Sequence, residues 1–194
     1  MPFQVKAFVC WGFISTSLIE SPNIFLGAGP MLKMIKMPRL SFVFLSIIRN
    51  LYTLAHTFVL CLIVLVFFPV KITWIILLFI PGLLLVIVTA FLVSVILGVL
   101  GSRFRDLSHI ISSFMTFIFM LTPVMWDASI LTGVKRMVVY LNPLFYYLSV
   151  VRDPLLNKIP TAQAYYGVFF MIAIFSLLAN YLYNRFAHRL IFWI

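Results

Sequence analysis

The sequence predicts an all-α, polytopic membrane helical bundle of about five transmembrane helices, with short re-entrant helices near the outer face. Of its 194 residues, 64% are hydrophobic and only 9% are charged, whereas soluble domains contain roughly 45–50% apolar and about 25% charged residues. Four stretches without Asp, Glu, Lys or Arg are long enough to cross about 30 Å of hydrocarbon. The composition excludes an ordinary soluble protein, and the length fits one membrane domain over residues 1–194.

The first apolar segment runs from Pro2 to Ile19 and forms an incomplete-looking span. Its uncharged part begins only at Ala7, so it reaches a spanning length only if Lys6 extends its amine toward the headgroups. The segment lacks the basic start and the small-residue cleavage site of a signal peptide. We therefore expect it to remain in the mature chain as the first of five spans.

The next segment, residues 20–40, has the features of a short amphipathic helix in a loop. Ser21 is predicted to cap this helix and Pro22 to be its first residue, while Gly27–Pro30 interrupts it. Exposed apolar residues followed by basic ones suit docking into a groove on a soluble partner. The alternative is a helix that lies on the membrane surface.

Four longer uncharged stretches supply the remaining spans. They cover Asn50–Val70, Ile72–Ser102, Leu107–Trp126 and Ile159–Asn184. The second stretch is too long for one straight perpendicular helix, and Pro81 with Gly82 predicts a kink or a late helix start. Ala90, Ser94 and Gly98 follow at helical spacing, which lets another helix approach closely, either within the chain or across a dimer.

The connection between the last two spans, residues 127–158, is predicted to form the short re-entrant helices of the outer face. Its apolar part, Met137–Val151, is interrupted by Asn142 and Pro143, which disfavours one continuous crossing. Aromatic residues gather around this connection and are either interfacial anchors or a surface on which sugar rings stack. They are Trp126, Tyr140, Phe145, Tyr146 and Tyr147.

The charge distribution indicates an orientation. The excess of 14 basic over 4 acidic residues gives a net charge of +10, which anionic headgroups explain without nucleic acid as a partner. Alternating connections place residues 20–49, residues 103–106 and the C-terminal tail on one face, which the positive-inside rule makes cytoplasmic by a narrow margin. Arg136 and Arg152 then lie outside, where they meet either an anionic polymer or headgroups.

Residues suited to catalysis are scattered. The acidic residues are Glu20, Asp106, Asp127 and Asp153, so a carboxylate pair would have to be assembled by folding. No histidine has a second ligand at i+4, and no Gly-x-x-x-x-Gly-Lys-Ser/Thr loop is present. The sequence predicts no catalytic residue, metal site or cofactor on this chain, so that energy for transport would come from another polypeptide.

Several motifs occur in a defined order along the chain. The main ones are Gly101–Leu107, Leu121–Val124, Leu141–Leu144 and Val151–Leu156, with Lys36–Arg39, Arg49-Asn50, His56 and the tail Arg189–Trp193 in addition. Together they resemble the permease subunit of ABC-type polysaccharide exporters, which move O-antigen, capsule or teichoic acid polymers. The resemblance covers essentially the whole chain and implies a multi-pass protein of the cytoplasmic (inner) membrane.

The resemblance also implies partners and roles. Two permease copies would work with two ATP-binding subunits, which hold ATP and Mg²⁺, to move lipid-linked polysaccharide. Residues 22–34 would be the coupling helix, residues 101–109 a second cytoplasmic contact, and residues 128–158 the outer gate. The implied docking residues are Asn23, Leu26, Leu32, Lys33, Lys36, Arg103, Arg105 and Asp106, and the implied translocation path is Phe114, Phe117, Trp126, Tyr146 and Tyr147.

One departure from the family pattern leads to alternatives. Family members have six spans after an amphipathic interface helix, whereas this chain begins at what corresponds to the second span, which implies an N-terminal truncation. A non-functional permease remnant is therefore one alternative. Another is an intramembrane enzyme of lipid-linked glycan assembly, for which Asp106, Asp127 or Asp153 would be indispensable.

Overall fold

The computed structural model describes residues 2–34, 37–67, 73–124, 139 and 141–193. Every regular element within these residues is helical. The elements are α1 (Pro2–Glu20), η1 (Ser21–Asn23), α2 (Ile24–Gly27), α3 (Gly29–Met34), α4 (Leu40–Phe67), η2 (Trp74–Leu78), α5 (Phe79–Arg103), α6 (Leu107–Leu121), α8 (Pro143–Leu155), α9 (Ala162–Phe186), η4 (Ala187–Arg189) and α10 (Leu190–Trp193).

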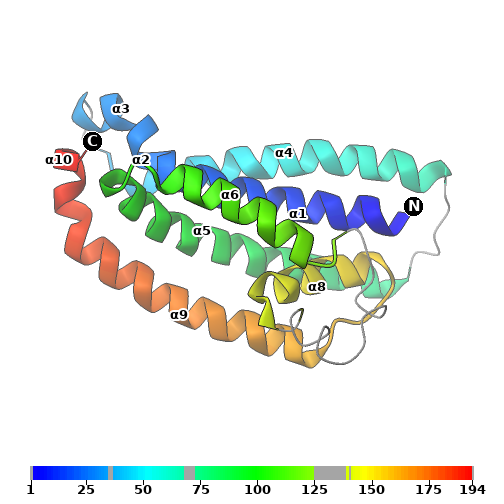
Figure 1. Cartoon of the computed structure of the whole chain (residues 1–194). Helices are drawn as coiled ribbons and strands as arrows, with labels where there is room; N and C mark the ends of the chain where they lie inside the picture. The colour runs from blue at the N-terminus through cyan, green and yellow to red at the C-terminus, as the bar shows by residue number, and fades with distance from the viewer. Residues whose placement is uncertain (1, 35–36, 68–72, 125–138, 140, 194) are drawn as a thin grey trace.

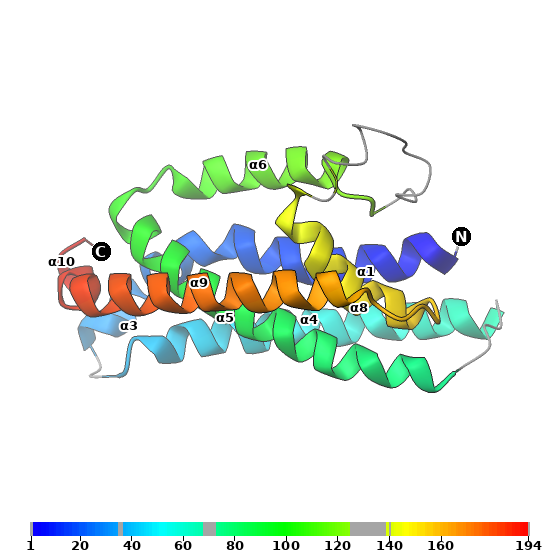
Figure 2. The same ribbon diagram turned by 90° about the horizontal axis from the view of Figure 1, so that it is seen from below.

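The long helices α1, α4, α5, α6 and α9 run lengthwise beside one another (Figures 1 and 2). Helix α5 is central, because it contacts α1, α4, α8 and α9 as well as η1 and α2. The short helices α2, α3 and α10 gather at one end of the bundle, while α8 lies toward the opposite end (Figure 1). The two chain termini lie at opposite ends.

Three helical segments in the described part of the chain are long and apolar enough to cross a membrane. They are Leu40–Val59, Trp74–Arg103 and Ala162–Arg189. Helix α6 is apolar but shorter, and α1 forms one continuous helix over the first predicted span. The prediction of a helical membrane bundle is therefore confirmed.

Helix α4 begins at Leu40, ten residues before the uncharged stretch from which that span was predicted. The stretch was short because Arg49 interrupts it, yet the arginine side chain is 65% exposed and paired with Glu20. An exposed, paired cation does not end a helix. A helix length predicted from the stretch without charged residues is therefore too short. The predicted late start near Pro81 is confirmed, since α5 begins at Phe79 after η2.

The small residues of α5 make the predicted close contact within the chain. A Cβ placed on Gly98 would lie 2.9 Å from Cε2 of Phe25, and one on Gly101 would lie 2.2 Å from the carbonyl oxygen of Pro22. Both neighbours belong to the segment that follows α1. Ser94 and Gly98 of the predicted row, together with Gly101, therefore contact that segment.

The described core forms two apolar clusters. The larger cluster joins α1, α5 and α8 through side chains such as Trp11, Val86 and Leu148. The smaller surrounds Phe25 at the end that carries α2, α3 and α10. Many large apolar side chains elsewhere on the spans are exposed, for example Leu84 and Leu177, as expected for surfaces solvated by lipid.

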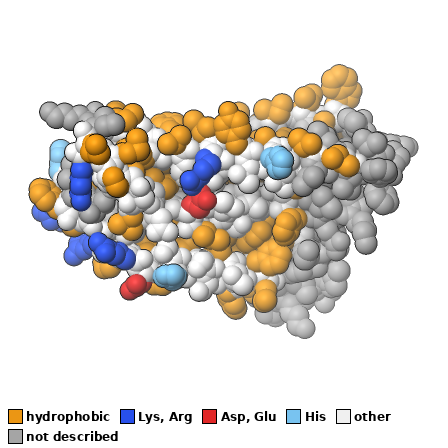
Figure 3. Space-filling model, turned by 90° about the horizontal axis from the view of Figure 1, so that it is seen from above, with side chains coloured by type: hydrophobic (Ala, Val, Ile, Leu, Met, Phe, Trp, Pro, Cys, Tyr) orange, Lys and Arg blue, Asp and Glu red, His pale blue; other side chains and the backbone are white. Residues whose placement is uncertain are grey.

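Basic side chains gather at one end of the bundle, where α3 and α10 lie (Figures 1 and 3). We call this end the basic end. It carries Lys33, Arg39, Arg103, Arg105, Arg185 and Arg189.

Candidate functional site

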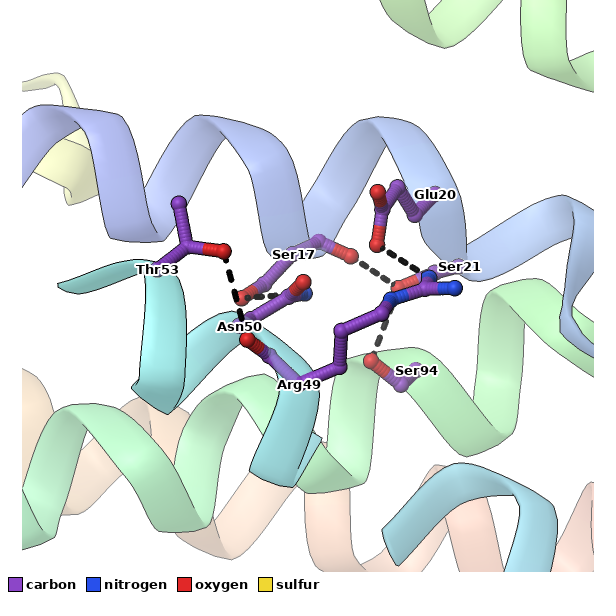
Figure 4. Close-up of polar contacts among 7 residues, drawn as sticks. All are labelled: Ser17, Glu20, Ser21, Arg49, Asn50, Thr53 and Ser94. Atoms are coloured by element: carbon purple, nitrogen blue, oxygen red, sulfur yellow. Dashed lines mark hydrogen bonds and ion pairs between the residues drawn. The ribbon is translucent and has the colours of Figure 1, made fainter. Parts of the chain in front are cut away.

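The segment Ser21–Met34, here called the docking segment, lies across the end of α5 at the basic end. The chain passes from α1 into η1 without leaving the helical region, since Glu20 has φ −78° and ψ −25°. The prediction that Ser21 caps a new helix is therefore wrong. Its hydroxyl donates to the carbonyl oxygen of Ser17 and lies 2.7 Å from Oγ of Ser94 on α5 (Figure 4).

The reason is burial. Ser21 is fully buried, so its hydroxyl needs a protein partner, and the preceding turn and α5 supply one each. A second buried contact joins α4 to α1, because Asn50 Nδ2 donates to Ser17 Oγ over 3.3 Å. Figure 4 shows that these side chains from α1, η1, α4 and α5 converge where the docking segment begins. The start of the segment is thereby linked to three long helices.

Apolar packing holds the rest of the docking segment. Phe25 is fully buried beside Gly98, and Leu32 is 9% exposed in the same cluster, together with Val95 and Val99 of α5. A buried aromatic ring against a glycine leaves little space for the segment to shift. The docking segment and α5 therefore form one packed unit.

The structure separates the predicted docking residues of this segment into two groups. Asn23 and Lys33 are exposed, and Leu26 is half-buried. Leu32 instead lies inside the smaller cluster, so it supports the segment from within rather than forming part of its outer surface. Lys36 lies outside the described residues. Met34, which is not among the residues predicted from the sequence to dock, is 84% exposed at the end of α3.

The second predicted contact lies at the same end of the bundle. Arg103, Arg105 and Asp106 are all exposed in the connection from α5 to α6. The Arg103 guanidinium lies 5.6 Å from the ring centre of Trp193 on α10, a cation–π contact that ties the C-terminal helix to this connection. Helix α10 also contacts α3. The tertiary structure thus brings both predicted docking regions to one surface.

The opposite end is organised by α8. Asn142 caps this helix, because its Oδ1 accepts a 3.0 Å hydrogen bond from the Leu144 amide, and its Nδ2 donates to Thr122 Oγ1 over 2.7 Å. With 13 residues, α8 is about 20 Å long, too short to cross the hydrocarbon. The sequence predicted short helices in this connection, and α8 is one short helix within it. Residues 127–138 and residue 140 of the same connection lie outside the described part of the chain.

Arg152 is turned inward, whereas its place in the sequence predicted a cation of the outer face that meets polymer or headgroups. Only 8% exposed, it donates through Nη1 to the carbonyl oxygen of Pro123 over 2.8 Å and pairs through Nη2 with Asp153 over 3.0 Å. The Ser149 hydroxyl donates to the same carboxylate. This cluster joins α8 to the residues that follow α6. The adjacent Arg-Asp pair was visible in the sequence, but its burial was not.

The predicted path residues do not line a single surface. Phe114 and Phe117 are 56% and 61% exposed on the outside of α6. Tyr146 is half-buried against Gly167 of α9, whereas Tyr147 is 4% exposed and lines a cavity of about 110 Å³ with Thr89. Trp126 lies outside the described residues.

The described residues contain no group of three or more His, Cys, Asp or Glu side chains that could hold a metal ion. Asp106 lies at the basic end and Asp153 in α8, toward the opposite end (Figure 1), so these two carboxylates do not form a catalytic pair. Asp127 lies outside the described residues.

Comparison with known protein families gives a match over most of the chain. A family model described as ABC-2 type transporter matches residues 7–156. The matched range includes most of α1, the whole docking segment, α4 to α6 and α8. Comparison with curated proteins gives no match.

Proposed function

Since the chain belongs to the ABC-2 type transporter family of membrane domains, we propose that it is the permease subunit of an ATP-driven exporter of lipid-linked polysaccharide. Proteins of this family are the membrane components of transporters and work with ATP-binding subunits. The chain is therefore a multi-pass membrane permease. The polysaccharide cargo, of O-antigen or teichoic acid type, is the further step that we propose here.

In the proposed assembly, two copies of the chain enclose the path and two ATPase subunits bind the basic end, which faces the cytoplasm. ATP and Mg²⁺ bind to the ATPase subunits. When these subunits close on ATP, the docking segment moves with them and transmits the displacement to α5 and α1.

The observation that carries this proposal is the approach of the docking segment to α5. At Gly101 no side chain separates α5 from the backbone of Pro22, and at Gly98 the buried ring of Phe25 fills the contact. A segment that presents Asn23 and Lys33 outward while packed this closely on a spanning helix can transmit a movement from a partner without deforming itself.

The proposal that the cargo is a polysaccharide is supported by sequence motifs. The string Gly101–Leu107, the Leu141–Leu144 segment and Val151–Leu156 resemble the motifs of polysaccharide exporters and follow in the same order. The exposed rings of Phe114 and Phe117 offer apolar faces of the kind on which sugar rings stack.

The test is to delete the gene in its native host and to purify the tagged chain from the same host. The proposal expects an ATPase with a phosphate-binding loop to copurify and lipid-linked glycan to accumulate on the cytoplasmic side of the deletion strain. Copurification of an ATPase without glycan accumulation would contradict the cargo alone. Absence of both results would contradict the proposal as a whole.

A further inference from the structure

A groove of about 760 Å³ lies at the basic end, between the docking segment and α4. Its walls are mostly apolar and include Ile24 and Leu45. The polar side chains on its wall include Glu20, Asn23 and Arg49. No element of the described chain fills this groove, so it is accessible from the side of the bundle.

The charged wall of the groove is a single ion pair. Arg49 Nη2 lies 2.7 Å from Glu20 Oε2, and the two side chains are 65% and 36% exposed (Figure 4). Exposed ion pairs contribute about 0–1 kcal/mol to stability, so folding alone is a weak reason for this pair. The guanidinium is planar with five N–H donors, and the contact with Glu20 engages only Nη2. Its remaining donors can therefore bind an anionic oxygen in the groove.

The groove continues into an apolar stripe on α4. Leu45, Ile48 and Tyr52 line the groove and are 63%, 48% and 75% exposed. Val59 and Ile63 follow on the same face, beyond the exposed side chain of His56, and are also exposed. The stripe therefore runs from the ion pair along most of the remaining length of the spanning helix α4.

We propose that this groove binds a membrane phospholipid with a zwitterionic headgroup, of the phosphatidylethanolamine type. The phosphate accepts hydrogen bonds from Arg49, the ammonium group pairs with Glu20, and an acyl chain lies along the stripe of α4. A headgroup with negative charge only would meet the Glu20 carboxylate without compensation, which disfavours anionic phospholipids. This site needs only the membrane fold, so it stands or falls independently of the polysaccharide cargo.

The test uses the full chain in detergent and counts bound lipid by native mass spectrometry, with phosphatidylethanolamine or phosphatidylglycerol added as the probe. We expect phosphatidylethanolamine to bind more tightly. Arg49→Gln and Glu20→Gln should each weaken its binding about tenfold, since a charge-assisted hydrogen bond contributes enough for one decade in affinity. Arg185→Gln is the matched control, because this arginine is exposed at the same end but does not line the groove.

A second variant blocks the groove without changing charge. Gly27 lines the groove, and a Cβ placed there meets nothing within 4 Å, so Gly27→Trp extends a ring into open space. Gly12 in α1 also has open space around its Cβ but lies outside the groove, so Gly12→Trp is the control. We expect lipid binding to be lost in Gly27→Trp and retained in Gly12→Trp.

Three results would overturn the proposal. The first is binding that is unchanged in Arg49→Gln, Glu20→Gln and Gly27→Trp, and the second is equal or tighter binding of phosphatidylglycerol. The third is a photo-crosslinker at residue 27 that, in native membranes, attaches to a protein instead of a phospholipid. A protein adduct would identify the groove as part of a protein interface.

Discussion

Phe25 and Gly98 are in direct contact, and the ring of the first occupies the space that any side chain on the second would need. Phe25 belongs to the docking segment and Gly98 to the central spanning helix, so this contact joins the predicted ATPase contact to the membrane bundle. It also identifies the substitutions that should separate transmission of movement from membrane insertion.

Phe25→Ala should loosen the docking segment while leaving the spans inserted. Removing a fully buried phenyl ring costs about 3–5 kcal/mol, because the cavity is filled only in part by relaxation. We expect a lower unfolding temperature of the purified chain and lower export, with normal amounts in the membrane. Phe170→Ala, which removes a 64% exposed ring from α9, is the control and should change the unfolding temperature little.

Gly101→Leu tests the backbone contact directly. The new Cβ would lie 2.2 Å from the carbonyl oxygen of Pro22, and backbone cannot move aside as a flexible side chain does. Overpacking of this kind costs about 1–3 kcal/mol or more, so the docking segment should be displaced and ATPase copurification reduced. Gly12→Leu has open space and should behave as the wild type. Normal copurification of the ATPase with both variants would show that the docking segment does not depend on the close contact between Gly101 and Pro22.

Lys33→Glu should weaken copurification of the ATPase subunit without lowering the amount of the permease. Lys33 is exposed at the basic end, so the substitution reverses a charge on the proposed docking surface. Lys158→Glu makes the same change at an exposed position beyond α8 and serves as the control. If the wild type, Lys33→Glu and Lys158→Glu all copurify equal amounts of the ATPase, Lys33 is not part of the docking surface.

Arg152→Ala should be among the most destabilising single substitutions in the chain. It leaves the half-buried Asp153 carboxylate without its cation and the Pro123 carbonyl without its donor. Breaking a buried ion pair by removing one partner costs about 3–5 kcal/mol. The double variant Arg152→Leu with Asp153→Leu should recover part of the lost unfolding temperature, because no unpaired charge then remains. Stability as low in the double variant as in the single one would contradict this account.

Phe114→Ala and Phe117→Ala distinguish a sugar path from a lipid anchor. Both rings are exposed on α6, so their loss should leave the core packing unchanged. A path role predicts lower export at a normal protein level, measured as glycan at the cell surface relative to permease in the membrane. Lower protein levels with unchanged export per molecule would indicate that the rings anchor α6 in the bilayer.

Much of the fold follows from local sequence. Long uncharged stretches predicted the spanning helices, Pro81 and Gly82 predicted the late start of α5, and Asn142-Pro143 predicted a short helix before the last span. These predictions succeed because the cost of an unpaired backbone group or a charge in hydrocarbon depends mainly on the residues of the segment itself. The row Ala90, Ser94 and Gly98 likewise predicted a close helix contact, though not its partner.

Other features were decided only when distant residues met. In the sequence, Arg49 and Arg152 are both cations close to a predicted span. In the structure, Arg49 is exposed on the groove, whereas Arg152 is buried beside Asp153. Ser21 was predicted to cap a helix and Leu32 to be a docking residue, whereas both side chains are buried against the bundle.

By itself, the sequence determined that the chain is a helical membrane protein. It also determined that residues 20–49, residues 103–106 and the C-terminal tail are rich in basic residues, because composition and spacing are properties of each segment. Only the tertiary structure decided which side chains face inward, which face lipid and which stay available to a partner. Burial depends on what packs against a residue from another helix, and a hydroxyl or a guanidinium takes its role from the partner that it finds there.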